Sequence, residues 1–253
     1  MSTGWPAVLW VARHGQSAGN VARDAAEAGG HAVIDIADRD VDVPLSALGE
    51  RQSDALGEWF GTKAAAERPT AVFCSPYVRA HQTAQRVAAG FGLPPDRLVR
   101  DERLREKEFG ILDRLTVHGI RDRHPDLAEQ RGHVGKFYFR PPGGESWCDV
   151  ILRLRSVLDM VTREYSRERV LIVGHQVTVN CFRYLLERLD EATILAFDRA
   201  GDVPNCSVTS YDFDATLGKR GKLVLKLTNF VAPLEAAGTP VTVQKDVPAA
   251  PKA

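Results

Sequence analysis

A short apolar run meets an arginine, a histidine and a glycine in the stretch Val8-Leu9-Trp10-Val11-Ala12-Arg13-His14-Gly15. The run has the length of an ordinary strand and ends at a turn residue, so it predicts a buried strand. Burial on both faces favours a parallel sheet covered by helices. Arg13 and His14 would then lie at the carboxyl end of a central strand, the edge where open α/β sheets bind ligands.

The residue types at this strand end indicate phosphoryl chemistry. Neutral histidine is a nucleophile near neutral pH, and a neighbouring cation opposes its protonation. Arginine matches phosphate geometry with paired hydrogen bonds. The alternative is that His14 only caps a loop, and three residues alone do not decide between the two. Polar donors follow near the same point at Gln16, Ser17 and Asn20.

Two further buried strands are each followed by residues that could bind a phosphoryl group. The clearest buried strand, 170–173, runs directly into Gly174-His175-Gln176, so the two strand-end histidines would meet if their strands are neighbours. The apolar run 71–74 is followed by Ser75 and a proline, which predict the start of a helix. Arg79 would lie in the first turn of that helix, where free N–H groups already favour anions. The alternative for Arg79 is an ordinary solvated helix arginine.

The remaining pattern predicts an α/β protein, a three-layer α/β/α sandwich with a mostly parallel central sheet. We expect one domain over residues 1–235 and a disordered tail, rich in Ala, Pro and Thr, over residues 236–253. The acidic connection 21–43 has no firm secondary structure. Further elements are expected as a helix capped by Ser46, an edge strand at 98–99, helices over 116–131 and 145–165, a helix through Cys181, and closing strands at 205–212 and 222–230.

Composition excludes several classes of function. The 253 residues hold 33 basic and 33 acidic side chains, which argues against a general nucleic-acid binder. No apolar run approaches the length of a membrane span, so no membrane partner is expected. The N-terminus shows no secretory pattern. The cysteines have no metal-like spacing and are expected as reduced thiols in the cytoplasm; they are Cys74, Cys148, Cys181 and Cys206.

A phosphoryl-transfer site also needs an acid to protonate the leaving oxygen. Glu102, Glu106 and Glu108 in the charged stretch 102–110 all qualify, and spacing does not choose among them. The stretch 136–146 interleaves aromatics with Lys136 and Arg140 before Pro and Gly residues. It predicts either a specificity loop or a hydrophobic plug with snorkelling basic ends.

Four motifs occur in one order: Arg-His-Gly-Gln-Ser at 13–17, Ser-Pro-Tyr-Val-Arg-Ala at 75–80, Leu-Arg-Glu with Phe-Gly at 104–110, and Gly-His-Gln at 174–176. Together they resemble the histidine phosphatase superfamily, in its phosphoglycerate mutase-like branch, over residues 8–212. This implies a phosphoglycerate mutase-like fold. The segment 137–146 and the Gly-His-Gln motif resemble the fructose-2,6-bisphosphatase-like phosphatases, but Asn180 stands where those carry a substrate-binding arginine.

The resemblance also implies residue roles. His14 would take the phosphoryl group, and Arg13, Arg79 and His175 would line the phosphate pocket. Glu106 would be the proton donor, because it is the Glu of the Leu-x-Glu motif that precedes Phe-Gly. No metal or other cofactor is required, and the expected partner is a small phosphorylated metabolite. Substrate contacts are implied for Gln16, Ser17, Asn20 and Gln176, while Lys136 and Arg140 suggest a substrate with more than one negative group.

The expected function is hydrolysis of phosphomonoesters through a phosphohistidine on His14. One alternative is a phosphoglycerate mutase on the same site, which would usually carry a larger insertion between the acid and the second histidine. The other is a non-catalytic protein that binds a phosphorylated ligand. The presence of every motif residue needed for the chemistry weakens this second alternative.

Overall fold

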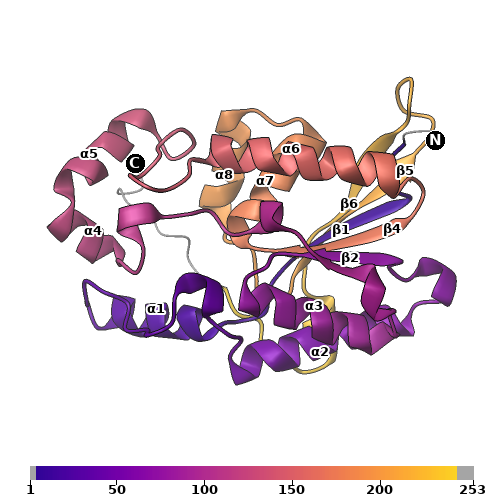
Figure 1. Ribbon diagram of the computed structural model, residues 1–253, viewed down its shortest axis with the longest axis horizontal. Coiled ribbons are helices and arrows are strands. Elements are labelled where there is room, and N and C mark those ends of the chain that lie inside the picture. Colours follow the sequence, from indigo (N-terminus) through magenta and orange to yellow (C-terminus); the bar gives the residue numbers. More distant parts are fainter. Residues whose placement is uncertain (1–3, 244–253) are drawn as a thin grey trace.

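The computed structural model describes residues 4–243, and within them the strands form one mixed, six-stranded sheet (Figure 1). The strand order is β3-β2-β4-β1-β5-β6. The first four of these strands are parallel, whereas β5 and β6 are antiparallel to their neighbours. The expected mostly parallel sheet is therefore confirmed. The bounds are Val8–Arg13 for β1, Ala71–Cys74 for β2, Leu98–Arg100 for β3, Arg169–Gly174 for β4, Val208–Asp214 for β5 and Lys222–Phe230 for β6.

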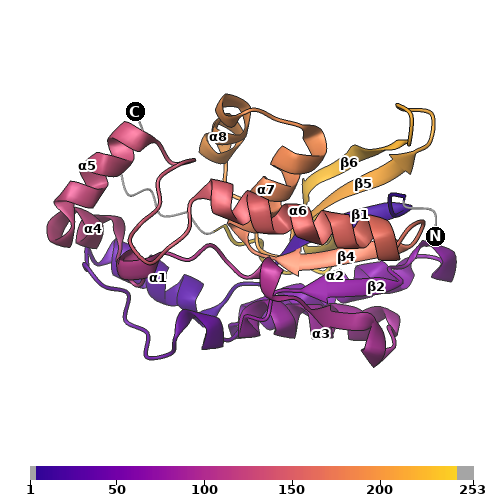
Figure 2. The same cartoon turned by 45° about the horizontal axis from the view of Figure 1, so that its top comes forward.

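Helices cover both faces of the sheet, which gives the expected three layers. In Figures 1 and 2, α2 and α3 lie on one face, α6 and α7 lie on the other, and α1, α4 and α5 gather beyond one end of the strands. The bounds are Ala18–Ala28 for α1, Ala47–Thr62 for α2, Val78–Phe91 for α3, Val117–Arg123 for α4, Pro125–Val134 for α5, Trp147–Glu164 for α6, Gln176–Glu187 for α7, Glu191–Ala200 for α8 and Ala232–Ala236 for α9.

Successive side chains of the central strands enter two separate cores, because neighbouring residues of a strand point to opposite faces. Leu9 and Val11 of β1 pack in the cluster under α6 and α7. Trp10 and Ala12 pack in the cluster under α2 and α3. These four side chains are all buried, so both faces of β1 are covered, and its end is fixed in space.

The layer formed by α2 and α3 depends on a close contact between two glycines. A Cβ atom added to Gly90 would lie 2.4 Å from the carbonyl carbon of Gly57, so a larger side chain at Gly90 would push the helices apart. The contact lets α2 and the last turn of α3 approach closely on one face of the sheet.

Several element boundaries differ from the expectation. The helix that follows β2 begins at Val78 with Tyr77 as its N-cap, not at Ser75. The expected helix over 116–131 is divided into α4 and α5, because the chain turns at His124, the residue before a proline. Helices α1, α8 and α9 were not expected.

The prediction of a disordered tail from residue 236 is corrected for residues 236–243. Thr242 accepts a hydrogen bond on its carbonyl from the amide of Asn205 at 2.9 Å, and its hydroxyl donates to the side chain of Asn205 at 3.0 Å. Gln52 on α2 also binds this segment, through the carbonyl of Pro240 at 2.9 Å. These polar contacts fix the segment against α2 and against the loop before β5. Residues 244–253 lie outside the described part of the chain.

Candidate active site

The two strand-end histidines lie together, as the sequence predicted. Strands β1 and β4 are parallel neighbours, and Arg13 is in register with Gly174, so His14 and His175 leave the sheet side by side. Their ring centroids are 5.1 Å apart at an angle of 66°. His14 is 3% exposed and His175 is fully buried. His14 therefore lies at the carboxyl edge of the sheet, with His175 packed against it from below.

Three helices begin at this edge. Helices α1, α3 and α7 start within a few residues of the ends of β1, β2 and β4. The free N–H groups and the dipole of each helix start favour an anion. The α1 start is fixed by a capping box, in which Ser17 Oγ accepts from the Asn20 amide at 3.1 Å and Asn20 Oδ1 accepts from the Ser17 amide at 3.0 Å. The backbone thus makes the edge electropositive before side chains are counted.

A pocket opens above the histidines. Of the residues predicted for the site, its wall contains Arg13, His14, Ser17, Asn20, Arg79, Glu106 and Gln176. Glu102 and Glu108 do not line it, so the structure separates Glu106 from the other two candidate acids. His175 lies beneath the wall, where it contacts the ring of His14.

The hydrogen bond of the His14 ring defines which nitrogen can react. Nδ1 lies 2.6 Å from the carbonyl oxygen of Gly15, and because a carbonyl only accepts, Nδ1 donates. The neutral ring then carries its lone pair on Nε2. The backbone of His14 is held as well, since its carbonyl accepts from Asn205 Nδ2 at 3.0 Å and its amide donates to the Gly174 carbonyl at 2.9 Å.

Burial and two cations keep both rings neutral. Burial lowers the pKa of His14 well below its usual value, and Arg79 and Arg13 lower it further. The pKa of His175 is likewise well below its usual value. Burial is the largest cause, followed by the charges of Arg79 and His14. His175 Nε2 lies 2.8 Å from Ser75 Oγ. A neutral His14 is the form that can attack an electrophile.

This burial predicts an acid-sensitive fold. Below the unfolded-state pKa of 6.5, the unfolded chain binds protons that the folded rings do not. The free energy of unfolding should therefore decrease as the pH is lowered. The limiting slope is about 1.4 kcal/mol per pH unit for each ring. Urea unfolding at several pH values should show this slope of the free energy of unfolding against pH. His14→Gln should make the slope smaller. An unaltered slope in the His14 variant would contradict the assignment.

The two arginines are oriented by different partners. Arg13 Nη1 donates to Gln176 Oε1 at 3.0 Å and also to the carbonyl of Val203, while Gln176 Nε2 donates to Asp202 at 2.7 Å. The side chain of Arg79 is 7% exposed and is paired with Asp40, with Nη1–Oδ1 at 3.0 Å and Nη2–Oδ2 at 3.2 Å. A carboxylate therefore sits against the guanidinium that the sequence assigns to phosphate.

Replacing Asp40 with asparagine is expected to tighten competitive inhibition by inorganic phosphate about fivefold to tenfold. The carboxylate competes with phosphate for Arg79 and repels it, and charge-assisted hydrogen bonds are the strong ones. Steady-state inhibition measures the effect. Asp42→Asn is the matched control, because Asp42 lies in the same 3-10 helix but pairs with Arg39 at the surface. Weaker phosphate binding in the Asp40 variant would instead show that Asp40 holds Arg79 in place.

Glu106 lies close to the second histidine. Its Oε2 is 3.8 Å from His175 Nδ1, and its Oε1 accepts from the Lys107 amide at 2.8 Å. Among the described residues, His175 Nδ1 has no hydrogen-bond partner. The carboxyl group thus stands at the pocket wall beside the paired rings, where it can exchange a proton with a bound ligand.

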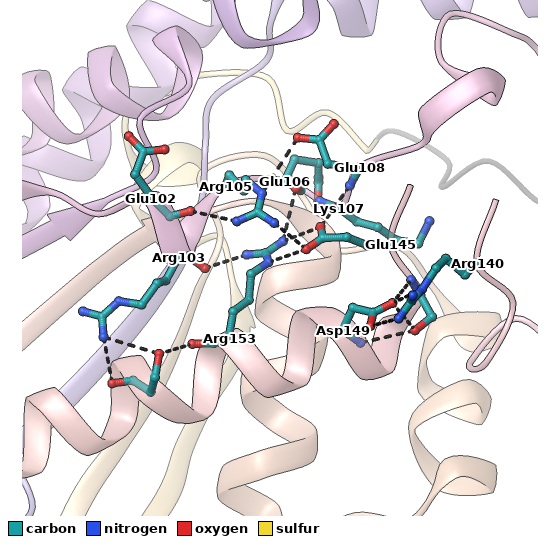
Figure 3. A network of polar contacts seen from close by, with 12 residues as sticks. Glu102, Arg103, Arg105, Glu106, Lys107, Glu108, Arg140, Glu145, Asp149 and Arg153 are labelled. Carbon is teal, nitrogen blue, oxygen red and sulfur yellow. Dashed lines mark hydrogen bonds and ion pairs between the residues drawn. The ribbon is translucent and has the colours of Figure 1, made fainter. Parts of the chain in front are cut away.

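Three predicted substrate residues do not line the pocket. Gln16 turns to Ser46, whose hydroxyl donates to Gln16 Oε1 at 2.7 Å. Lys136 pairs with Asp198 at 2.6 Å. Arg140 pairs with Asp149 at the start of α6, away from Glu106 (Figure 3). The predicted substrate role of these three side chains finds no support in the geometry.

The 136–146 loop fits the alternative expectation better, which was a hydrophobic plug with snorkelling basic ends. Phe137 and Phe139 are 3% and 5% exposed, so these aromatics plug the core, while the basic ends of the neighbouring Lys136 and Arg140 form ion pairs.

The pocket also contains residues that sequence reasoning missed. Most come from α1 and from the connection between α1 and α2, which has little regular structure. One signal was available, because serine is a preferred N-cap residue and Ser17 directly precedes α1. The missed residues are Gly19, Arg23, Ile34, Ile36, Asp38, Asp40, Val43, Phe109, Asp113, Arg114 and Val177.

The model of the histidine phosphatase superfamily (branch 1) matches residues 9–223. The chain belongs to the histidine phosphatase superfamily. Among relatives, it is 33% identical over 177 residues to 6-phosphofructo-2-kinase/fructose-2,6-bisphosphatase of Caenorhabditis elegans, a match that covers 70% of this chain and 33% of that protein. The chain thus spans about a third of the length of that histidine phosphatase relative.

Other proteins match this chain over more of their length. The phosphoglycerate mutase-like protein AT74H of Arabidopsis thaliana is 27% identical over 230 residues, which cover 83% of this chain and 75% of that protein. The structure of YhfR from Bacillus stearothermophilus is 25% identical, with a TM-score of 0.68 and coverage of 90% of this chain and 98% of that one. A mycobacterial glucosyl-3-phosphoglycerate phosphatase shares the fold at 24% identity, a TM-score of 0.67 and coverage of 89% and 98%.

Two features are absent from residues 4–243. No helix in this range combines the length and apolar character needed to cross a membrane. The same residues contain no cluster of three or more His, Cys, Asp or Glu side chains placed to hold a metal ion.

Proposed function

We propose that the protein is a phosphatase that hydrolyses phosphomonoesters of small metabolites through a phosphohistidine on His14. The observation that carries this proposal is the contact of the two buried rings, 5.1 Å apart, with the Nδ1 proton of His14 committed to the Gly15 carbonyl. Nε2 is then the nucleophile. Arg13 and Arg79 stand at the same pocket to bind the phosphoryl oxygens.

In the first step, Nε2 of His14 forms a bond to phosphorus as the ester P–O bond breaks. The electron pair of that bond stays on the leaving oxygen, and Glu106 supplies the proton that makes it an alcohol. Arg13, Arg79 and the helix starts stabilise the charge on the transferring group, which is where most catalysis of phosphoryl transfer arises.

In the second step, water attacks phosphorus and the P–N bond breaks. Glu106, now ionised, accepts a proton from the water and is returned to its acid form. Dividing hydrolysis into two displacements replaces one difficult step with two easier ones. The proposed chemistry uses only groups of the protein and water, so we expect full activity in the presence of a chelator.

Substrate contacts are proposed for the polar side chains that line the pocket, Ser17, Asn20 and Gln176. Apolar side chains such as Ile34, Ile36 and Phe109 line the same pocket. A compact phosphorylated metabolite with some apolar surface fits such a lining better than a macromolecule.

The test is release of free phosphate over a panel of phosphorylated sugars and acids, with 3-phosphoglycerate included. Free phosphate with turnover supports the phosphatase. Conversion of 3-phosphoglycerate to its isomer without free phosphate would identify a mutase instead. Binding of phosphorylated ligands without any turnover across the panel would identify a non-catalytic protein.

A further inference from the structure

Arg153 of helix α6 holds the loop that carries Glu106 by two hydrogen bonds to its backbone. Arg153 Nη1 donates to the carbonyl of Arg103 at 2.5 Å, and Nη2 donates to the carbonyl of Glu106 at 3.2 Å. Figure 3 shows the guanidinium reaching from α6 to this loop. The backbone of Glu106 is thus fixed to a helix that packs in the core under the sheet.

The same arginine is paired with Glu145, which holds the loop at two more points. Arg153 Nε donates to Glu145 Oε1 at 3.0 Å and Nη2 donates to Oε2 at 3.1 Å. Glu145 Oε2 also accepts from the amide of Glu108 at 3.1 Å, and Oε1 accepts from Arg105 at 2.7 Å. The pair therefore forms hydrogen bonds with the chain on both sides of Glu106.

Little freedom remains for the carboxyl group between these attachments. The side chains of Arg153 and Glu145 are 10% and 11% exposed, so the pair is largely withdrawn from water. A paired charge in such a place is costly to break, because the remaining partner is left uncompensated. Oε1 of Glu106 is occupied by the Lys107 amide, and Oε2 lies 3.8 Å from His175 Nδ1.

We propose that Arg153 and Glu145 are positioning residues for proton transfer by Glu106. This inference rests on the proposed function, since it takes Glu106 as the acid. The forked guanidinium and the two-oxygen carboxylate fix the backbone of the acid, and this sets the distance from its carboxyl group to the leaving oxygen. An error of about 1 Å in such a distance can cost on the order of 100-fold in rate.

The test compares two leaving groups in Arg153→Met. Phosphorylation of the enzyme is followed in the first turnover with an alkyl phosphate, whose alcohol must be protonated as it leaves, and with 2,4-dinitrophenyl phosphate, whose phenolate leaves unaided. We expect a loss of at least about tenfold with the alkyl phosphate and less than about twofold with the dinitrophenyl ester. Arg155→Met is the matched control, because Arg155 lies on the same helix with its side chain exposed.

Two further variants keep the test decisive. Arg153→Lys retains a cation but not the fork, so we expect it to behave like Arg153→Met; full rescue by lysine would show that charge alone matters and would overturn the positioning role. Glu145→Gln preserves shape and should show the same selective loss, smaller in size, even if Arg153→Met does not fold. Equal losses on the two substrates would also overturn the inference, because they indicate general damage.

Glu106→Gln, measured in parallel, separates this inference from the proposed function. A selective loss in Glu106→Gln without one in the Arg153 and Glu145 variants would overturn only the positioning role. If the rate of enzyme phosphorylation falls equally with both substrates in Glu106→Gln, the acid itself is misassigned. The proposed mechanism then fails along with the inference.

Discussion

Replacing His14 with alanine is expected to lower kcat for phosphate release by at least about 10⁴-fold, since loss of a nucleophile removes the covalent route. The remaining activity would come from the arginines and helix starts, which still bind phosphate. The effect is measured as free phosphate released from the best substrate of the panel. Binding of inorganic phosphate should persist in this variant, because Arg13 and Arg79 are unchanged.

The control for His14 is His81→Ala. His81 lies on α3, two positions after Arg79, but it does not line the pocket. Its replacement should change kcat by less than about twofold. Thermal unfolding of both variants checks that each remains folded. Retention of substantial phosphatase activity in a folded His14→Ala protein would exclude a phosphohistidine at this position.

Replacing Arg79 with methionine is expected to reduce kcat/KM by about 10²- to 10³-fold. Arg79 is the largest charge contribution that lowers the pKa of His14 and of His175, after burial itself. Its removal should therefore raise both pKa values. A protonated His14 cannot attack, so the acidic limb of the kcat/KM profile should move to higher pH in the variant.

The pH profile distinguishes this role from a general loss of binding. Arg86→Met is the matched control, because Arg86 is on the same helix but pairs with Asp54 and Glu50 on α2. It should leave both kcat/KM and the position of the acidic limb unchanged. An Arg79 variant with reduced kcat/KM and an unshifted limb would show that the guanidinium binds phosphate without controlling protonation of the histidines.

The sheet and the histidine pair were predictable because their signals are local. Apolar runs that end at Arg13 and at Gly174 identify two buried strands, and β1 and β4 are indeed parallel neighbours. The choice of Glu106 was different in kind. Three glutamates in a charged loop are chemically equivalent in sequence, and only the family motif selected the one that lines the pocket.

What could not be predicted depends on contacts between distant residues. Asp40 lies in a segment with no periodic pattern, and only the folded chain brings it to Arg79, 39 positions away. Thr242 belongs to a stretch whose composition is typical of disorder, yet Asn205 and Gln52 bind it. Lys136 and Arg140 looked like anion ligands because a sequence shows their charge but not the aspartates that neutralise them.

The central claim is that His14 becomes phosphorylated. The most direct measurement is rapid quenching of the enzyme with a substrate labelled in its phosphoryl group, followed by peptide mapping under alkaline conditions. We expect one label on His14 that is stable in base, lost in acid and absent from His14→Ala. A label on a serine, a cysteine or an aspartate, or no covalent label during turnover that releases phosphate, would contradict it.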